Sequence, residues 1–191
     1  MKKVKIGAGA GFSGDRIEPA VELAENGNLD YLVFECMAER TISIAQEQKS
    51  QDPDKGYDPL LKQRMLAVIA ICRRKKIKII SNMGAANPLA AAKCVQEIAR
   101  SLGEVGLRIA AITGDDLLAV VTSEDLQLDN GKTSLELGDR LISANVYLGA
   151  APIAGALAEG ADIVLTGRSS DPALFLGPLI HEFGWAMDDW E

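Results

Sequence analysis

Positive charge is scarce in this sequence relative to negative charge. Its 191 residues include 20 Lys and Arg against 27 Asp and Glu, which gives a formal net charge of −7. Non-specific binding to nucleic acids or anionic membranes depends on clustered positive charge. The composition therefore argues against both kinds of partner. The one basic cluster, residues 73–76, lies where a helix is expected to end, and cations there stabilise the helix dipole.

Cysteine, histidine and long apolar runs are also scarce. The three cysteines are an odd number without C-x-x-C spacing, so neither a disulfide framework nor a zinc knuckle is indicated. The longest apolar run, residues 149–158, is much shorter than the roughly 20 residues that a membrane helix needs. These absences predict a protein of a reducing compartment with no membrane span, and we expect it in the cytoplasm. The only histidine, His181, lies within a predicted helix, where a structural role is expected.

Short apolar runs alternate with longer stretches of helical periodicity along the chain. The runs are almost continuously apolar, which is typical of parallel strands buried on both faces. The alternation predicts one α/β domain over residues 1–191, a three-layer sandwich with a mostly parallel sheet of five or six strands. An incomplete β/α barrel is the alternative. The expected strands are Val4–Ala8, Tyr31–Glu35, Ile77–Ser81, Arg108–Thr113 and Ile163–Thr166, with Asn145–Leu148 as a weaker sixth.

Apolar periodicity and capping residues predict five helices between these strands. Asn87 followed by Pro88 combines a capping residue with proline at the first helical position. Residues 123–139 are polar and include Asp129-Asn130-Gly131, which indicates a hairpin or loop inserted into the alternation. The expected helices are residues 18–25, 60–74, 88 to about 102, 152–158 and 172–183.

Polar loops follow the predicted strands at their carboxyl ends. Parallel strands place all of these ends at one edge of the sheet, and open α/β sheets bind ligands in a crevice at that edge. Five loops that are distant in the sequence are therefore expected to meet there. They are residues 9–15, 36–41, 82–87, 114–116 and 167–171.

A G-x-G-x-x-G pattern follows the first predicted strand. Its glycines are Gly9, Gly11 and Gly14. The pattern suggests a dinucleotide site, with Glu35 in the place of the acid that binds the ribose. Pro19 argues against this reading, because proline fits best at the first helical position and would start the helix about five residues after the last glycine. We expect either a loop whose amides bind another anion, assisted by Ser13 and Arg16, or a wide turn without a ligand.

Two carboxylates lie four residues apart in the second loop. Glu35 and Glu39 could act as acid and base if burial raises the pKa of one of them toward neutrality. Alternatively, Glu39 forms an ion pair with Arg16 or Arg40, and Glu35 caps a neighbouring helix. Cys36 has no histidine near it in the sequence, so a small buried hydrophobic residue is the better interpretation.

The third loop leads into a predicted helix whose positive N-terminal end would face the crevice. Asn82, Gly84 and Asn87 are its candidate ligand-binding residues. The last loop contributes Arg168 and Asp171, which either clamp a carboxylate or phosphate or form a buried structural pair. Both loops thus point to a negatively charged ligand.

Paired aspartates occupy the loop after the fourth predicted strand. Asp115 and Asp116 are hard oxygen ligands of the kind that magnesium takes, and they form the weak candidate metal site. Asp115 is also a candidate for proton transfer. The alternative is that Asp115 only caps the segment that follows it.

Five segments in this order resemble one known family. They are GAGAGFSGDR (7–16), FECMAERT (34–41), NMGAANP (82–88), ANVYLGA (144–150) and HEFGW (181–185). The chain is similar in these segments to the acyclic terpene utilisation protein A family, long described as a domain of unknown function. The resemblance implies a bacterial-type catabolic protein that acts in the breakdown of branched acyclic terpenoids, whose intermediates are carried as coenzyme A thioesters. It implies no catalytic residues. Family members typically extend further, so we expect this chain to be the N-terminal part of a longer architecture.

Two functions follow from the loops and the resemblance together. In the first, the chain is an enzyme, or its larger part, that acts on an anionic acyl thioester or carboxylate. The glycine loop and Arg168 would hold the anion, and Glu35 or Asp115 would move protons. In the second, it is a non-catalytic subunit that presents the same crevice to a partner chain. The cofactor is unknown: a coenzyme A thioester as substrate, a divalent metal, a homo-oligomer and a complementary C-terminal chain stay open. An oxidoreductase that binds NAD(P) or FAD is less favoured.

Overall fold

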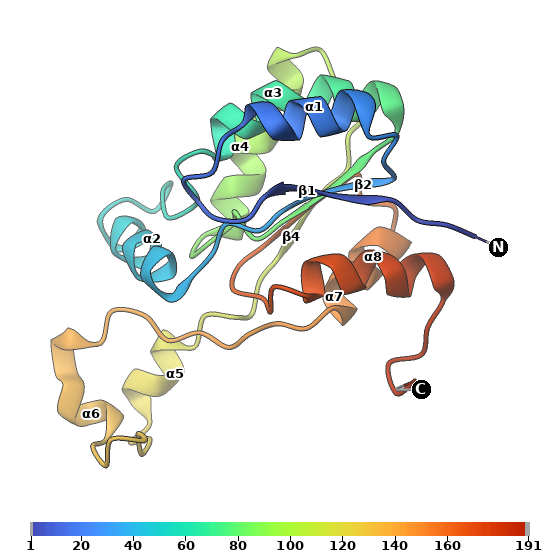
Figure 1. Ribbon diagram of the computed structural model, residues 1–191. Coiled ribbons are helices and arrows are strands. Elements are labelled where there is room, and N and C mark those ends of the chain that lie inside the picture. Colours follow the sequence, from blue (N-terminus) through green and yellow to red (C-terminus); the bar gives the residue numbers. More distant parts are fainter. Residues whose placement is uncertain (1, 190–191) are drawn as a thin grey trace.

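The computed structural model describes residues 2–189 and contains one open sheet of five parallel strands (Figure 1). The strands are β1 (Ile6–Ala10), β2 (Tyr31–Phe34), β3 (Lys78–Ser81), β4 (Ile109–Ile112) and β5 (Ile163–Thr166). Their order across the sheet is β1-β2-β3-β5-β4, and every neighbouring pair is parallel. The predicted α/β class is therefore confirmed. Because the sheet is open and its strands do not lie in sequence order, as those of a β/α barrel do, the alternative of an incomplete β/α barrel is wrong.

Helices cover both faces of the sheet and complete the predicted three-layer sandwich. One face carries α1 (Glu18–Asn26), α3 (Leu61–Lys75) and α4 (Pro88–Ser101), and the other carries α7 (Ala151–Ala158) and α8 (Ala173–Phe183) (Figure 1). These helices begin and end within one residue of the expected positions. Side chains alternate between the two layers, so that Leu32 faces the first and Val33 the second.

The chain changes direction across the sheet at one place. β1, β2 and β3 are neighbours in sequence order, but the chain then passes the position of β5, forms β4, and returns. As a result, α4 after β3 and α8 after β5 leave adjacent strands toward opposite faces. This is the topological switch point, next to which open α/β sheets bind ligands.

Helix α2 (Glu39–Gln51) is the longest element that the sequence analysis missed. Only Ile42 and Ala45 of its 13 residues are buried, so its apolar face is too narrow to give a clear helical pattern. α2 packs on the loops beyond the strand ends, in one cluster with Met37, Ala85 and Ala86 (Figure 1). The expectation that residues 36–41 form a loop is thus corrected, because Glu39 lies in the first turn of a helix.

The weaker sixth strand, Asn145–Leu148, is absent from the sheet of the described chain. Asn145 and Leu148 form only isolated bridges, with Asp116 and Ser169. The reason is that each is tied to a different loop: the Asn145 side chain donates to Asp115, and the Leu148 amide donates to the Arg168 carbonyl. Because Asn145 and Leu148 are hydrogen-bonded to different loops, the segment between them does not pair regularly with one strand.

Two smaller differences concern the start of β1 and the segment between β4 and α7. β1 begins two residues later than expected, because pairing with β2 starts at Ile6, and it therefore includes Gly9. Within residues 123–139, for which a hairpin or loop was predicted, residues 127–133 form a short turn closed by a bridge between Gln127 and Thr133. The elements around this turn are α5 (Leu118–Ser123), α6 (Ser134–Leu137) and the short 3-10 helix η1 (Gly138–Arg140).

Within residues 2–189, no helix is long and apolar enough to cross a membrane.

Candidate functional site

A fully buried arginine, Arg64 on α3, lies beneath the loop that follows β1 (residues 11–17, the β1 loop). Its Nη2 donates to the carbonyl oxygens of Asp15 at 2.9 Å, Ser13 at 3.0 Å and Phe12 at 3.4 Å. In a trans peptide the N–H points away from the preceding C=O. The amides of Ser13 and Gly14 therefore point away from Arg64. Neither amide has a hydrogen-bond partner among the described residues.

The charge of Arg64 is balanced by a buried carboxylate, Asp58. Arg64 Nη1 lies 3.4 Å from Asp58 Oδ1 and 3.1 Å from Cys36 Sγ. The second carboxylate oxygen of Asp58 accepts the Ser13 hydroxyl at 2.5 Å. Burial raises the pKa of Asp58, and the hydrogen bond from Ser13 opposes this shift. Sequence reasoning missed this pair, although an arginine within the apolar stripe of Leu61, Met65 and Val68 was an available signal.

The β1 loop already holds one negative charge, that of Asp15. Its carboxylate accepts the Gly11 amide at 3.0 Å and the Arg16 amide at 2.9 Å. These bonds, with that from Gly11 first, lower the pKa of Asp15. The loop amides thus stabilise an anion, but the Gly11 amide is used by the protein itself. α1 begins at Glu18 with Pro19 in its first turn, as the sequence predicted.

Gly9 lies in β1 and faces the core, outside the β1 loop. It is buried, and a Cβ at this position would be 2.8 Å from the ring of Phe34. Its smallness allows β1 to pack against that ring. Of the three glycines in the predicted pattern, Gly11 and Gly14 are the two that lie in the exposed loop.

Asn82 joins the ends of β2 and β3. Its side chain is fully buried: Oδ1 accepts the Cys36 amide at 2.7 Å, and Nδ2 donates to Glu35 Oε1 at 3.0 Å. The same Glu35 oxygen accepts the Met37 amide at 2.9 Å. Burial raises the pKa of the Cys36 thiol, which therefore stays protonated, as a small buried residue should. In this arrangement Asn82 and Glu35 stabilise the backbone at the edge of the sheet.

Asn87 caps α4, as the sequence predicted. Its Oδ1 accepts the Ala90 amide at 3.2 Å, and its Nδ2 donates to the carbonyls of Pro53 and Lys55, each at 2.7 Å. Gly84 precedes this cap and lies directly against the end of β5. Residues 81–86 are all buried, so this loop fills the switch point.

Arg168, which follows β5, reaches across the switch point to the loop after β2. Its Nη1 donates to the Met37 carbonyl at 2.7 Å, and its Nη2 donates to Tyr147 Oη at 2.6 Å and Glu39 Oε1 at 2.9 Å. The Arg168 side chain is 7% exposed, whereas that of Glu39 is 79% exposed. Hydrogen bonding from Tyr147 and the charge of Arg168 lower the pKa of Glu39. The partner of Glu39 is thus Arg168, rather than Arg16 or Arg40.

The predicted partner of Arg168, Asp171, lies elsewhere. Its side chain is exposed, and it makes no hydrogen bond within the described part of the chain. The buried charge pair proposed for Arg168 and Asp171 is therefore replaced by the pair of Arg168 with Glu39. Arg168 reaches Glu39 because α2 brings its first turn over the end of β5, a contact that no local pattern reports.

Asp115 and Asp116 interact with different segments of the chain. Asp115 is 3% exposed, and its Oδ2 accepts the Arg168 amide at 2.7 Å and the Asn145 side chain at 3.0 Å. Asp116 accepts the Leu118 amide at 3.0 Å through Oδ1 and lies 3.3 Å from Lys49 Nζ through Oδ2. No cluster of three or more potential metal ligands occurs in the part of the chain that the structure describes.

Replacing Asp115 by asparagine is expected to stabilise the protein increasingly as the pH rises. Burial raises the pKa of Asp115 above its unfolded value of about 3.9, so ionisation between pH 4 and neutrality costs stability. Asparagine can accept the same two hydrogen bonds without ionising. Urea unfolding at pH 4.5 and pH 7 should show a larger advantage of Asp115→Asn over the parent protein at pH 7. Asp171→Asn, at an exposed side chain without a hydrogen bond in the described part of the chain, is the control, and an advantage of Asp115→Asn that does not change with pH would contradict the expectation.

His181 lies in the last turn of α8, far from these loops. Its neighbour Glu182 accepts a hydrogen bond from Tyr31, the first residue of β2. The end of α8 is therefore at the amino edge of the sheet, opposite the candidate site. His181 thus lies within the predicted helix, at its end, and has no contact with the candidate site.

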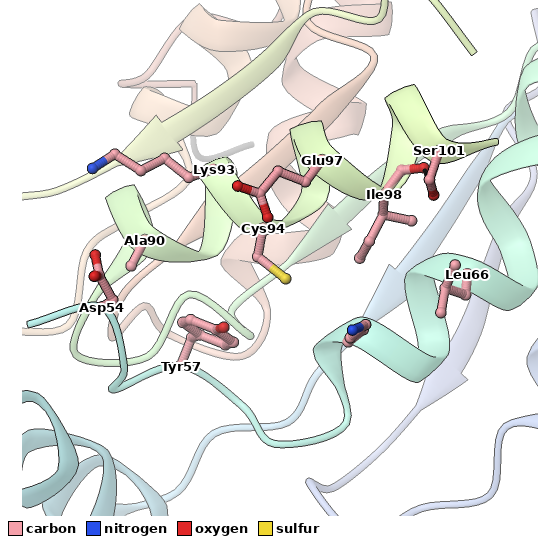
Figure 2. A pocket seen from close by; sticks show the side chains of 10 residues that line it. Asp54, Tyr57, Leu66, Ala90, Lys93, Cys94, Glu97, Ile98 and Ser101 are labelled. Carbon is pink, nitrogen blue, oxygen red and sulfur yellow. Dashed lines mark hydrogen bonds between the residues drawn. The ribbon is translucent and has the colours of Figure 1, made fainter. Parts of the chain in front are cut away.

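Several depressions lie beside the loops at the carboxyl edge, among them a groove and a smaller pocket. A groove of about 570 Å³ runs between α3 and α4, and it is lined by Leu66 on α3 and by Lys93 and Glu97 on α4 (Figure 2). Its charges are of both signs, which is typical of a solvated surface. A pocket of about 120 Å³, the α2 pocket, lies beneath α2. It is lined by segments that follow β1, β2 and β3, together with α2 itself, represented by Ser13, Met37, Ala85 and Ala45.

One family model matches the chain. It is described as "Acyclic terpene utilisation family protein AtuA" and matches residues 4–191, a range that includes every candidate site residue. No curated protein and no solved structure matches the chain. The similarity therefore supports the resemblance carried by the five sequence segments.

Proposed function

The chain belongs to the acyclic terpene utilisation family AtuA, and from that membership we propose that it binds an anionic acyl ligand across the carboxyl edge of the sheet. The family gives it a role in acyclic terpene utilisation. The ligand we propose is a coenzyme A thioester or the corresponding free carboxylate. The observation that supports this most directly is the pair of outward-pointing amides at Ser13 and Gly14.

These two amides are suited to an anion because the protein fixes their direction in advance. Arg64 holds the carbonyls of Phe12 and Ser13 on the inner side, so the N–H groups stay outside without a bound ligand. Donors that need no reorganisation stabilise negative charge most effectively. The lowered pKa of Asp15 is a sign that amides of this loop stabilise negative charge.

Arg168 supplies a second group for a negative charge. Its guanidinium has five N–H donors, and its hydrogen bonds to Met37, Glu39 and Tyr147 use three of them. The exposed Glu39 carboxylate lies where a ligand carboxylate or phosphate would bind, so a ligand would displace it. β1 and β5 are three strand spacings apart, or about 14 Å. A ligand that contacts both groups is therefore extended, as a coenzyme A thioester is.

Thermal melting in the presence of candidate ligands tests the proposal. At about 100 times its dissociation constant a ligand stabilises the fold by about 2.7 kcal/mol, which corresponds to a rise in Tm of roughly 5–10 °C for a chain of this size. We expect such a rise with acetyl-coenzyme A or 3-methylbutanoyl-coenzyme A, but not with NAD. A shift with NAD alone would contradict the proposal and restore the dinucleotide interpretation.

Gly14→Val tests the amide pair itself. A Cβ on Gly14 would contact only the exposed ring of Phe12, at 3.2 Å, so the variant should fold while the new side chain blocks close approach of an anion. Hydrogen bonds to charged groups contribute about 1.5–3 kcal/mol, so titration calorimetry should show coenzyme A binding weakened roughly 10- to 100-fold. Gly155→Ala on α7 is the control with unchanged affinity. Equal affinity of Gly14→Val and the parent protein would count against an anion site here.

The hydrogen bonds that Glu35 and Asp115 accept favour a ligand-binding role of the chain over a role of these carboxylates in proton transfer. Glu35 accepts hydrogen bonds from Met37 and Asn82, and Asp115 from Arg168 and Asn145, so both carboxylates stabilise the edge of the sheet. On this ground we propose a binding subunit ahead of an enzyme. Turnover of an acyl thioester by the isolated chain, abolished in Glu35→Gln or Asp115→Asn, would reverse that order.

A further inference from the structure

We infer that the α2 pocket binds the branched hydrocarbon end of the acyl chain, a group of about four or five carbons. The inference rests on the proposed acyl ligand and adds the place and the size of its apolar end. It is derived from the polarity of the pocket wall, the volume of the pocket and its position beside Ser13.

The wall of the α2 pocket is apolar even where polar residues line it. The Asp58 carboxylate accepts hydrogen bonds from the Ser13 hydroxyl, the Leu60 amide and Arg64. Asn82 also lines the pocket, and its side chain is hydrogen-bonded to the Cys36 amide and to the Glu35 side chain. The polar atoms of these residues are therefore bonded to one another and are not available to a ligand.

Most of the remaining lining is apolar, although Thr41, Gln48 and Tyr57 also border the pocket. Met37, Ala45 and Ala85 are buried and belong to one apolar cluster, and Ile44 and Pro59 also line the pocket. A hydrocarbon gains free energy by leaving water for such a wall, whereas a polar ligand would lose its hydrogen bonds. The pocket chemistry thus selects a hydrocarbon.

The volume sets the length of that hydrocarbon. About 120 Å³ corresponds to about four water-sized groups of roughly 30 Å³ each. Sites for whole drug-sized ligands occupy about 300–1,000 Å³, so only one end of a longer molecule enters here. A methyl-branched end of four or five carbons matches this volume, whereas a longer straight chain would continue beyond it.

Ser13 connects the pocket to the anion site. The residue lines the α2 pocket, while its amide and that of Gly14 point outward from the same loop. An acyl chain in the pocket would therefore place its polar end beside these amides. The rim is formed by Ile44, which is 44% exposed, so a ligand can enter past a side chain with little packing to lose.

Affinity as a function of the acyl group tests this inference. 3-Methylbutanoyl-coenzyme A has three carbons more than acetyl-coenzyme A, and each fully buried methylene strengthens binding about fourfold. We expect up to about 60-fold tighter binding of the branched thioester in titration calorimetry. Ala45→Leu fills the pocket, so it should abolish this preference while binding of acetyl-coenzyme A stays within about twofold.

Glu47→Leu is the matched control, because it places the same side chain on the exposed side of α2. It should keep the preference for the branched thioester. A preference that survives in Ala45→Leu, or that is lost equally in Glu47→Leu, would overturn the inference. Thermal melting of both variants shows whether α2 is still folded against the loops.

A neutral probe separates this inference from the proposed function. 3-Methylbutan-1-ol has the same branched end without a charge, and it should shift the NMR methyl signals of Met37 and Ala45 in the parent protein. If the alcohol binds and no thioester or carboxylate does, the proposed anionic ligand is wrong and the hydrocarbon pocket stands. If thioesters bind but neither the alcohol nor the acyl group affects these signals, the pocket assignment is wrong and the anion site stands.

Discussion

Arg64→Ala is expected to lower the free energy of unfolding by about 3–5 kcal/mol. The substitution leaves the Asp58 carboxylate buried without its counter-ion, and breaking a buried pair in this way typically costs that much. It also removes the donor that holds the carbonyls of Ser13 and Asp15. Since domains are stable by only about 5–15 kcal/mol, the variant should be close to unfolding. Urea unfolding monitored by circular dichroism measures the difference.

Arg74→Ala is the matched control on the same helix. Arg74 is 60% exposed and pairs with Glu25 at 2.7 Å, and exposed pairs of this kind contribute about 0–1 kcal/mol. If Arg64→Ala fails to fold, Arg64→Lys keeps the charge but loses the planar fork, and should retain part of the stability. A loss for Arg64→Ala no larger than that for Arg74→Ala would show that the buried pair does not organise this edge.

Gly84→Ala is expected to lower the free energy of unfolding by about 1–3 kcal/mol. A Cβ on Gly84 would lie 2.5 Å from the carbonyl oxygen of Thr166 and 3.0 Å from the Cα of Pro88. Both are backbone atoms, so β5 and the start of α4 would have to move apart, with the cost that overpacking usually has. The loop after β3 lies against β5 at the switch point, and we therefore expect weaker ligand binding as well.

Gly155→Ala should instead raise the free energy of unfolding. Gly155 lies within α7 and has open space where a Cβ would be, so alanine should stabilise the helix by about 0.5–1 kcal/mol. Thermal and urea unfolding of both variants under one condition gives the comparison. If Gly84→Ala were as stable as the parent protein, the close approach of this loop to β5 would not be a constraint on the fold.

The carboxyl edge of the sheet is closed by the protein's own side chains. Arg168 is covered by Glu39 and Tyr147, and the loop of residues 81–86 is buried under α2. A ligand that reaches both the β1 loop and Arg168 must displace the Glu39 carboxylate. Binding should therefore become weaker when Glu39 is held more firmly and stronger when it is removed, since the ligand and Glu39 compete for the same guanidinium.

The fold class and the convergence of the loops were available from the sequence. Continuous apolar runs such as Ile163–Thr166 mark strands buried on both faces, and Pro19 and Asn87 mark helix starts by purely local stereochemistry. Once the strands are parallel, the geometry of the sheet itself brings their carboxyl ends to one edge. The sequence therefore predicted that these loops share one edge, but not the order of the strands along that edge.

What each side chain does within that edge was decided only by the tertiary structure. α2 was missed because a helix that packs on loops buries just Ile42 and Ala45, too few residues to produce a period. The pairing of Arg64 with Asp58, and of Arg168 with Glu39, joins residues from different elements, and an ion pair leaves no trace in the spacing of either partner. Most of the secondary structure follows from interactions between near neighbours in the chain, and so the sequence determined that part. The choice of partner for each charged group depends on which segments the completed sheet brings within hydrogen-bonding distance, and that was settled only when the chain folded.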